Sequence, residues 1–264
     1  MSLTLSTGPF GPKRRGNFNF DTSALKPHTL YFEDTPKRIR AVFGGETIAD
    51  SRQARLLFET AIMPVHYFPR EDVRMDLLEP TDHTTHCPFK GDASYWTIKV
   101  GDAEAENAAW GYAEPQPESA WLDGYVALYW DKMNHWFEED EEILGHPRDP
   151  YHRVDVLRSS RRVKVSANGE IIAESARPMA LFETGFPPRY YLPSEDVNTD
   201  LLTPSETKTR CPYKGLASYW TVEADGERIE DAVWTYPEPL SEAERVKDHL
   251  CFYDGKVSVE VEDS

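Results

Sequence analysis

The segment C-P-F-K-G-D-A-S-Y-W-T at residues 87–97 returns as C-P-Y-K-G-L-A-S-Y-W-T at residues 211–221. The same offset of 124 residues (211 − 87) pairs L-F-E-T at residues 57–60 with L-F-E-T at residues 181–184. No insertion is needed from about residue 38 to the last residues. The chain therefore consists of two copies of one unit of roughly 100 residues, which is a usual size for a single domain.

The residues around this motif predict a mainly β unit. Segments typical of strands lie at residues 38–43, 47–49, 65–68, 93–98, 108–112 and 125–130 of the first copy, and at 162–165, 171–173 and 189–192 of the second. Asn168-Gly169 between two such segments is a strong hairpin signal. Residues 51–60 could be a short helix by propensity or a strand. Short strands separated by glycine and proline predict two tandem copies of a small twisted-sheet or barrel-like domain with short helical turns.

Four segments are expected along the chain. Residues 1–30 form an N-terminal arm without periodicity, and they have no counterpart before the second copy. The first repeat domain covers residues 31–138, a linker covers 139–159, and the second repeat domain covers 160–264. Because the two domains share one sequence pattern, we expect them to pack against each other as an intramolecular pseudo-dimer.

The composition limits the classes of partner. The net charge is −17, from 29 basic and 46 acidic residues, so nucleic acid and anionic membrane surfaces would be repelled. No apolar run approaches the roughly 18 residues of a membrane span, and the first residues do not resemble a secretory signal. Three cysteines provide no disulfide framework. A cytoplasmic protein is expected.

Several motifs together resemble the domain of unknown function 427 family in its tandem form. They are F-P-x-E-D-V at residues 68–73, D-L-L at residues 76–78, A-x-W-x-Y at residues 108–112 and the repeated C-P-[FY]-K-G-x-A-S-Y-W string. The resemblance covers nearly everything from about residue 30 to residue 260. It implies a small strand-rich domain similar to the β-tent folds. A nucleotidyltransferase label is sometimes attached to the family, but this sequence has no glycine-rich nucleotide loop and no G-S motif followed by paired aspartates.

The repeated motif places a lysine three residues after a cysteine, just before a glycine. Lys90 near Cys87 could lower the pKa of the thiol and make it a nucleophile. A lysine beside aromatic residues could instead bind an anionic substrate or form a Schiff base. In the structural alternative, Cys87 is a small buried hydrophobe and Lys90 is paired with an acid. The same alternatives apply to Cys211 and Lys214, which are the equivalent residues of the second copy.

Two glutamates are candidate general bases. Glu59 and Glu183 lie in identical L-F-E-T contexts, and a carboxylate in an aromatic pocket can act as a base if its pKa is raised. Asp92 lies beside Lys90 in the motif, whereas Leu216 takes its place in the second copy. We therefore expect the first site to be the more polar one.

Repeated aromatic residues are candidates for ligand binding. These are Tyr67, Tyr95 and Trp96 in the first copy, and Tyr191, Tyr219 and Trp220 in the second. In a small β domain most aromatic side chains must belong to the core. Adjacent Tyr95 and Trp96 should point to opposite faces of their strand, so one of them could line a cavity while the other fills the core.

Neither a metal nor a cofactor is expected. His83, His86 and Cys87 are plausible metal ligands, but the second copy has threonine and arginine in place of the two histidines. No dinucleotide-binding fingerprint is present.

The sequence favours a small-molecule enzyme or ligand-binding protein. Each repeat would hold a pocket walled by aromatic residues and anchored by Lys90 or Lys214, for an anionic or carbonyl-bearing ligand. The alternative is a non-catalytic scaffold whose repeated motifs are structural. A deep pocket lined by Lys90 and Glu59 would favour ligand binding. A solid core with Lys90 in a surface ion pair would favour the scaffold.

Overall fold

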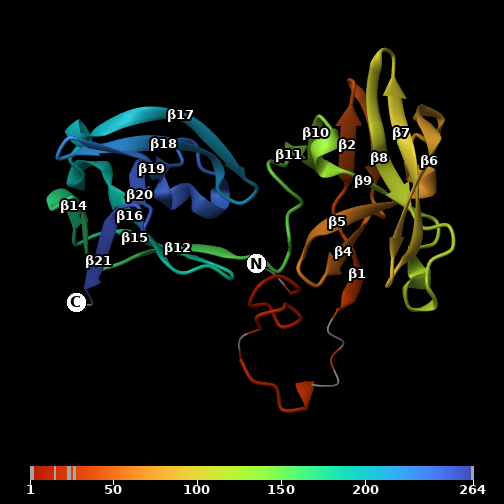
Figure 1. Cartoon of the computed structure of the whole chain (residues 1–264), viewed down its shortest axis with the longest axis horizontal. Coiled ribbons are helices and arrows are strands. Elements are labelled where there is room, and N and C mark those ends of the chain that lie inside the picture. Colours follow the sequence, from red (N-terminus) through yellow and green to blue (C-terminus); the bar gives the residue numbers. More distant parts are fainter. Residues whose placement is uncertain (1–2, 15, 23–24, 26–27, 263–264) are drawn as a thin grey trace. The chain divides into compact units, whose positions relative to one another are not determined.

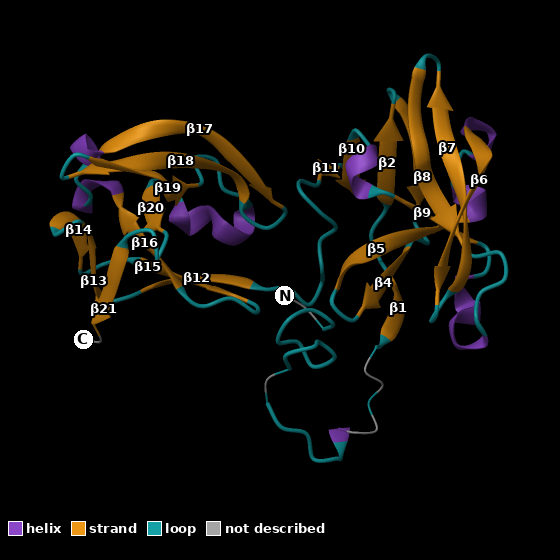
Figure 2. Ribbon diagram, viewed as in Figure 1, coloured by secondary structure: helices purple, strands orange, loops and turns teal. Residues whose placement is uncertain are grey.

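A computed structural model describes residues 3–14, 16–22, 25 and 28–262. The chain divides into two compact units, Leu3–Asp149 and the residues from Pro150 onward, and each contains one repeat (Figure 1). Strands dominate both units, as Figure 2 shows. The predicted pair of mainly β domains is confirmed.

The first unit contains a seven-stranded and a four-stranded antiparallel sheet. The larger sheet has the order β1 (Leu30–Asp34), β4 (Arg55–Glu59), β5 (Ile62–Pro69), β9 (Tyr125–Leu128), β8 (Ala103–Gly111), β7 (Gly91–Val100) and β6 (Leu78–Cys87). The smaller sheet has the order β11 (Glu141–Glu142), β10 (His135–Glu138), β2 (Ile39–Phe43) and β3 (Glu46–Ser51). The larger sheet is open, with β1 and β6 at its edges, so the twisted sheet rather than a closed barrel is found.

The second unit repeats the order of the seven-stranded sheet, but its smaller sheet has three strands instead of four. Its larger sheet has the order β12 (Val154–Arg158), β15 (Met179–Glu183), β16 (Arg189–Pro193), β20 (His249–Phe252), β19 (Glu227–Thr235), β18 (Gly215–Ala224) and β17 (Leu202–Cys211). Its smaller sheet has the order β14 (Glu170–Ser175), β13 (Arg162–Ala167) and β21 (Ser258–Glu262). Because the order of the seven strands is the same in both units, residues 124 apart occupy equivalent places in the two folds.

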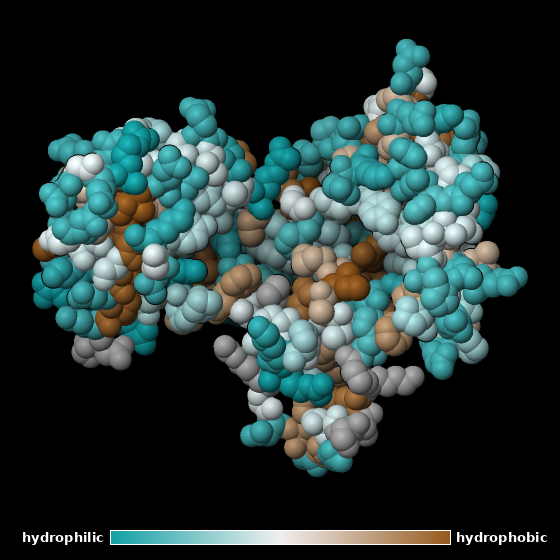
Figure 3. Space-filling view, in the orientation of Figure 1, coloured by the Kyte–Doolittle hydropathy of each residue, from teal (hydrophilic) through white to brown (hydrophobic). Residues whose placement is uncertain are grey.

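The helical segments within the two repeats, among the residues that the structure describes, are short 3-10 turns. They are η2 (Arg70–Asp72), η3 (Met75–Leu77), η4 (Pro117–Leu122) and η5 (Trp130–Lys132) in the first unit, and η6 (Ser194–Asp196), η7 (Thr199–Leu201) and η8 (Ser241–Val246) in the second. None of the helices in the described part of the chain has the length and apolarity to cross a membrane. Hydrophilic residues cover most of the face of each unit that Figure 3 presents.

Each large sheet carries a core on both faces. In the first unit, one face packs with the smaller sheet through residues such as Ile39, Ile48 and Ile98. The other face carries a second cluster that includes Leu57 and Tyr67. Tyr95 belongs to this second cluster, whereas the adjacent Trp96 packs against the first, as strand alternation predicts.

Two local expectations need correction. Residues 55–59 form strand β4, which pairs with β1 and β5, so the helical alternative for residues 51–60 is wrong. Strand β12 lies inside the segment 139–159 that the sequence assigned to a linker, and it pairs with β15 at the edge of the second sheet. This edge strand was missed because V-D-V-L-R at residues 154–158 follows a proline-rich stretch and has little sequence in common with β1.

Candidate functional site

A buried polar cluster of His28, Glu59 and Lys90 lies in the first repeat. Glu59 Oε1 lies 2.8 Å from His28 Nε2, and Glu59 Oε2 accepts a hydrogen bond from Lys90 Nζ. Only 7% of the Glu59 side chain and 11% of the Lys90 side chain are exposed. The structure therefore brings together two residues that the sequence singled out, Glu59 and Lys90, in a buried ion pair.

The backbone around Lys90 explains the repeated Lys-Gly pair. Lys90 lies in the turn between β6 and β7, where its N–H donates to Cys87 O at 3.2 Å and its carbonyl accepts from Gln116 N at 3.1 Å. Gly91 has a φ of +102°, and a Cβ there would lie 3.0 Å from Glu114 O. Only glycine fits this conformation and this close approach without strain. The turn thus holds the lysine at one place.

His28 is a member of this cluster that the sequence analysis missed. Its ring stacks on Phe89, with centroids 4.0 Å apart. Hydrogen bonds between Thr29 and Thr60, of 3.0 and 3.1 Å, tie the segment to the end of β4. The assignment of residues 1–30 to an arm without a counterpart is therefore wrong for His28, because His152 lies 124 residues later. Extending the offset upstream of residue 38 would have found it.

The second repeat reproduces the cluster. His152 Nε2 lies 3.1 Å from Glu183 Oε1, and Lys214 Nζ donates to Glu183 Oε2. His152 stacks on Tyr213, with centroids 4.2 Å apart. Burial alone would raise the pKa of Glu183, but the hydrogen bond from His152 and the charge of Lys214 outweigh it and lower this pKa to about 2. Such a carboxylate is too weak a base for proton abstraction near neutral pH.

A cavity of about 490 Å³ adjoins the cluster in the first repeat. Glu59, Lys90 and Tyr67 line it, and most of the remaining wall is apolar or aromatic, including Leu57, Met63, Val65, Trp110, Leu128, Tyr129, Trp130 and Trp136. Cys87, Tyr95 and Trp96 are not among its lining residues. The structure therefore gathers three of the six candidates of the first repeat around one cavity.

His66 is a further polar residue in the cavity wall. Burial, and to a smaller extent the charge of Lys37, lowers the pKa of His66 to about 3, so its ring is neutral. Its Nδ1 makes no hydrogen bond with the residues that the structure describes. A buried polar atom without a partner is uncommon in folded proteins and calls for a ligand or an ordered water. Tyr190 stands at this position in the second repeat, so the comparison of the two copies gave no signal for His66.

The remaining candidates of the first repeat lie away from the cavity. Tyr95 is buried, and its hydroxyl lies 2.8 Å from Thr85 Oγ1. Trp96 packs on the other face of the sheet, under the guanidinium of Arg70 at 5.5 Å. Cys87 is half-buried and packs against the core cluster around Tyr67. These three residues fit structural roles.

The equivalent residues of the second repeat are arranged in the same way. Tyr219 hydroxyl lies 2.8 Å from Thr209 Oγ1, and Cys211 is half-buried. Tyr191 is buried and accepts a hydrogen bond from Trp234 Nε1 at 3.0 Å. Trp220, in contrast, lines a groove on the opposite face of the sheet.

An arginine changes the surroundings of the second cluster. Arg189 takes the place of Val65, and its guanidinium carbon lies 5.8 Å from the centre of the Trp234 ring. Trp234 is the equivalent of Trp110, which lines the cavity of the first repeat. The two cavities described for the second repeat are lined by neither Lys214 nor Glu183. The expected pocket at Lys214 is therefore not found among the described cavities, and a cationic side chain covers the tryptophan there.

Asp92 does not cause the difference between the two sites. Its side chain is 81% exposed and pairs with His86, whose Nδ1 lies 2.6 Å away. The expectation that Asp92 makes the first site more polar is thus wrong, because strand alternation directs this side chain to solvent. The described residues include no group of three or more histidine, cysteine or acidic side chains placed to hold a metal ion.

Comparison with known protein families agrees with the duplicated fold. The model of the domain of unknown function DUF427 matches residues 31–139 and again residues 155–263. No curated protein matches the chain. The two matches cover most of the chain and coincide with the two sheet-rich repeats. The chain therefore belongs to the DUF427 family and carries two tandem copies of its domain.

Proposed function

We propose that the first repeat binds a small molecule that has an aromatic or aliphatic body and a carbonyl group. The cavity of about 490 Å³ lies within the range typical of small-molecule sites, and its walls are mostly apolar. Lys90 and His66 line it together with three other polar residues, Glu59, Asp131 and His146. The observation that carries the proposal is the buried His66 Nδ1, which lacks a hydrogen-bond partner among the described residues.

The charge balance of the cluster favours a neutral carbonyl group over a free anion. Glu59 already pairs with Lys90, so the two charges cancel, and an incoming anion would find little net attraction. A lysine ammonium has three N–H donors, so it can serve Glu59 and still donate to a carbonyl oxygen. His66 Nδ1 can exchange a second hydrogen bond with the same ligand. This narrows the anionic or carbonyl-bearing ligand expected from the sequence to the carbonyl-bearing one.

The geometry also limits the chemistry that this site supports. Lys90 Nζ donates a hydrogen bond to the Glu59 carboxylate, so forming a Schiff base at this nitrogen would require that buried ion pair to be broken. Cys87 does not line the cavity, so nucleophilic attack by its thiol on a bound ligand is not supported. An ammonium beside a carbonyl oxygen stabilises negative charge that develops there. A carbonyl compound in this cavity would therefore be polarised rather than attacked.

The second repeat supports the structural alternative for its own cluster. The buried contacts of the first cluster recur among His152, Glu183 and Lys214. Arg189 lies over Trp234, the equivalent of the cavity-lining Trp110. We therefore propose that this second cluster joins the end of β15 to the β17–β18 turn and binds no ligand.

The second repeat provides a matched control for a binding experiment. Neutral aromatic ketones, aldehydes and amides would be screened by thermal shift, with the corresponding alcohols and amines as probes that lack the carbonyl. Isothermal calorimetry would then compare the hits on the wild type, Lys90→Met, Lys214→Met and His66→Phe. We expect Lys90→Met and His66→Phe to weaken binding about tenfold or more, and Lys214→Met to leave it unchanged. Equal binding to all four proteins, or equal binding of the alcohols, would overturn the proposal.

A further inference from the structure

Trp96 and Trp220 are equivalent residues, but an arginine covers only Trp96. In the first repeat, the guanidinium of Arg70 lies 5.5 Å from the ring centre of Trp96. In the second repeat, Ser194 replaces Arg70, and Trp220 lines an open groove instead. The backbone is equivalent at this point, because Arg70 N donates to Gly124 O at 2.9 Å and Ser194 N donates to Asp248 O at 3.2 Å. The groove therefore lies where the first repeat has a cationic side chain of its own.

The charge at this place is reversed between the repeats. Asp248 lines the groove in the second repeat, whereas Gly124 is its equivalent in the first. The exchange of Arg70 for Ser194 removes a positive charge, and the exchange of Gly124 for Asp248 adds a negative one. Asp248 has a φ of +61°, so an aspartate is accommodated here at some backbone cost. The second repeat thus has an open groove and a carboxylate at the place where the first repeat has the guanidinium of Arg70.

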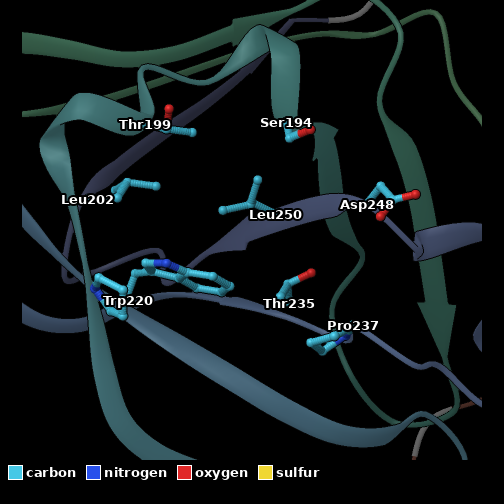
Figure 4. A pocket seen from close by; sticks show the side chains of 9 residues that line it. Ser194, Thr199, Leu202, Trp220, Thr235, Pro237, Asp248 and Leu250 are labelled. Atoms are coloured by element: carbon cyan, nitrogen blue, oxygen red, sulfur yellow. The ribbon is translucent and has the colours of Figure 1, made fainter.

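Figure 4 shows how the lining side chains surround this groove, which has a volume of about 440 Å³. In this view Leu202 lies above the indole of Trp220, and Leu250 lies between the indole and Asp248. Ser194 and Asp248 lie on the side away from Leu202. The hydroxyl of Thr235 donates to His249 O at 2.6 Å, so its oxygen can only accept a hydrogen bond from a ligand. An aromatic face and a carboxylate together are the groups that recognise an organic cation.

We propose that the groove lined by Trp220 and Asp248 binds an organic cation, a guanidinium, amidinium or amine carried on an apolar body. The cation would lie over the indole as Arg70 lies over Trp96 in the first repeat, and its N–H groups would donate to the Asp248 carboxylate. The net charge of −17 also attracts a cation to this protein. This site is independent of the carbonyl site of the first repeat, because the two share no residue and lie in different units.

Benzamidine and benzamide test the charge requirement, because they share one shape and differ in charge. Binding to the full chain would be followed through the indole N–H resonance of Trp220, assigned with Trp220→Phe. We expect benzamidine to shift this resonance on titration and to bind about tenfold more tightly than benzamide. An acetylated and amidated Ala-Arg-Ala peptide would form a second arm. Higher affinity for the peptide than for benzamidine would identify a protein segment as the source of the cation. Higher affinity for benzamidine would identify a free small molecule.

Two substitutions introduce the first-repeat residue at its equivalent position in the groove, and each should weaken benzamidine binding. Ser194→Arg places a resident guanidinium beside Trp220 and is expected to weaken benzamidine binding about tenfold. Asp248→Gly is expected to weaken it about threefold, whereas Asp225→Gly removes the same charge at another exposed residue with positive φ and should have no effect. All three positions are exposed, and unchanged thermal unfolding would show that the variants fold. The proposal would be overturned if neither benzamidine nor the peptide bound, or if benzamide bound as tightly as benzamidine. It would also be overturned if Ser194→Arg bound benzamidine as tightly as the wild type.

Discussion

Replacing Lys214 by methionine tests whether the buried cluster stabilises its repeat. The change removes the ammonium that donates to Glu183 and leaves a carboxylate that is only 11% exposed. His152 remains as the one partner of that carboxylate within the cluster. Because a buried charge that has lost a partner is costly, we expect the second repeat to unfold more easily than in the wild type.

The pKa of Glu183 sets the size of the effect. Its fall from an ordinary value of 4.5 to about 2 in the folded protein corresponds to roughly 3 kcal/mol of stability. Since the folded pKa is the lower one, this stability is fully present above about pH 4.5 and is lost as the pH falls towards 2. His152 supplies part of it and Lys214 the rest, so Lys214→Met should cost about 2 kcal/mol at neutral pH, or about 8–10 °C in the Tm of the second repeat.

Urea unfolding of the full chain, followed by hydrogen exchange, would assign the change to one repeat. Backbone amides of β15 and β18 should lose protection in Lys214→Met, while those of β4 and β7 should keep it. Lys247→Met is the matched control, because Lys247 is an exposed lysine in the same repeat, and it should change stability by less than about 0.5 kcal/mol. The loss of stability between pH 4.5 and pH 2 should also be smaller in Lys214→Met than in the wild type.

Equal unfolding midpoints for Lys214→Met and Lys247→Met would refute this reasoning. So would an equal loss of stability between pH 4.5 and pH 2 in Lys214→Met and the wild type, because Lys214 would then contribute nothing to the low pKa of Glu183.

Three further changes test other parts of the structure. Trp96→Ala should destabilise the first repeat by about 3 kcal/mol because the indole packs against the core, and a calorimetric Tm equal to that of the wild type would contradict this. Gly91→Ala should cost about 2 kcal/mol because of its positive φ and the nearby Glu114 carbonyl, and a neutral effect in urea unfolding would show that the turn can relax. Arg189→Val should uncover Trp234, and a ligand of the first repeat should then bind at a second site by calorimetry, about tenfold more weakly because Tyr190 takes the place of His66; a stoichiometry of one would contradict this.

The repeated sequence predicted the duplicated fold well because it reports what both copies need. The motif around Lys90 and the L-F-E-T context of Glu59 identified two residues that meet in space, although they are 31 positions apart. Strand alternation also placed Tyr95 and Trp96 on opposite faces of the sheet. The family implied by the repeated motifs is confirmed.

The same comparison could not find features that differ between the copies. His66 has a tyrosine as its equivalent, and Val65 has an arginine, so the residues that shape the cavity carry no repeated signal. His28 and His152 are also 124 residues apart, but the sequence between them and the repeated hairpins differs in the two copies, so the pair carries a weak signal. Edge strands β1 and β12 share little sequence, since the edge of a sheet constrains its residues less than the centre does. The packing of the two repeats as a pseudo-dimer stays a prediction.

The indole N–H resonances of Trp110 and Trp234 provide the most direct test of ligand binding by the first repeat. The two residues are equivalent, but Trp110 lines the cavity with Lys90, whereas Trp234 lies under Arg189. After assignment with Trp110→Phe and Trp234→Phe, a carbonyl-bearing hit would be titrated into the full chain. We predict that the Trp110 resonance shifts with saturation and that the Trp234 resonance stays in place. Equal shifts of both resonances, or a stationary Trp110 resonance while calorimetry detects binding, would contradict a ligand site in the first repeat.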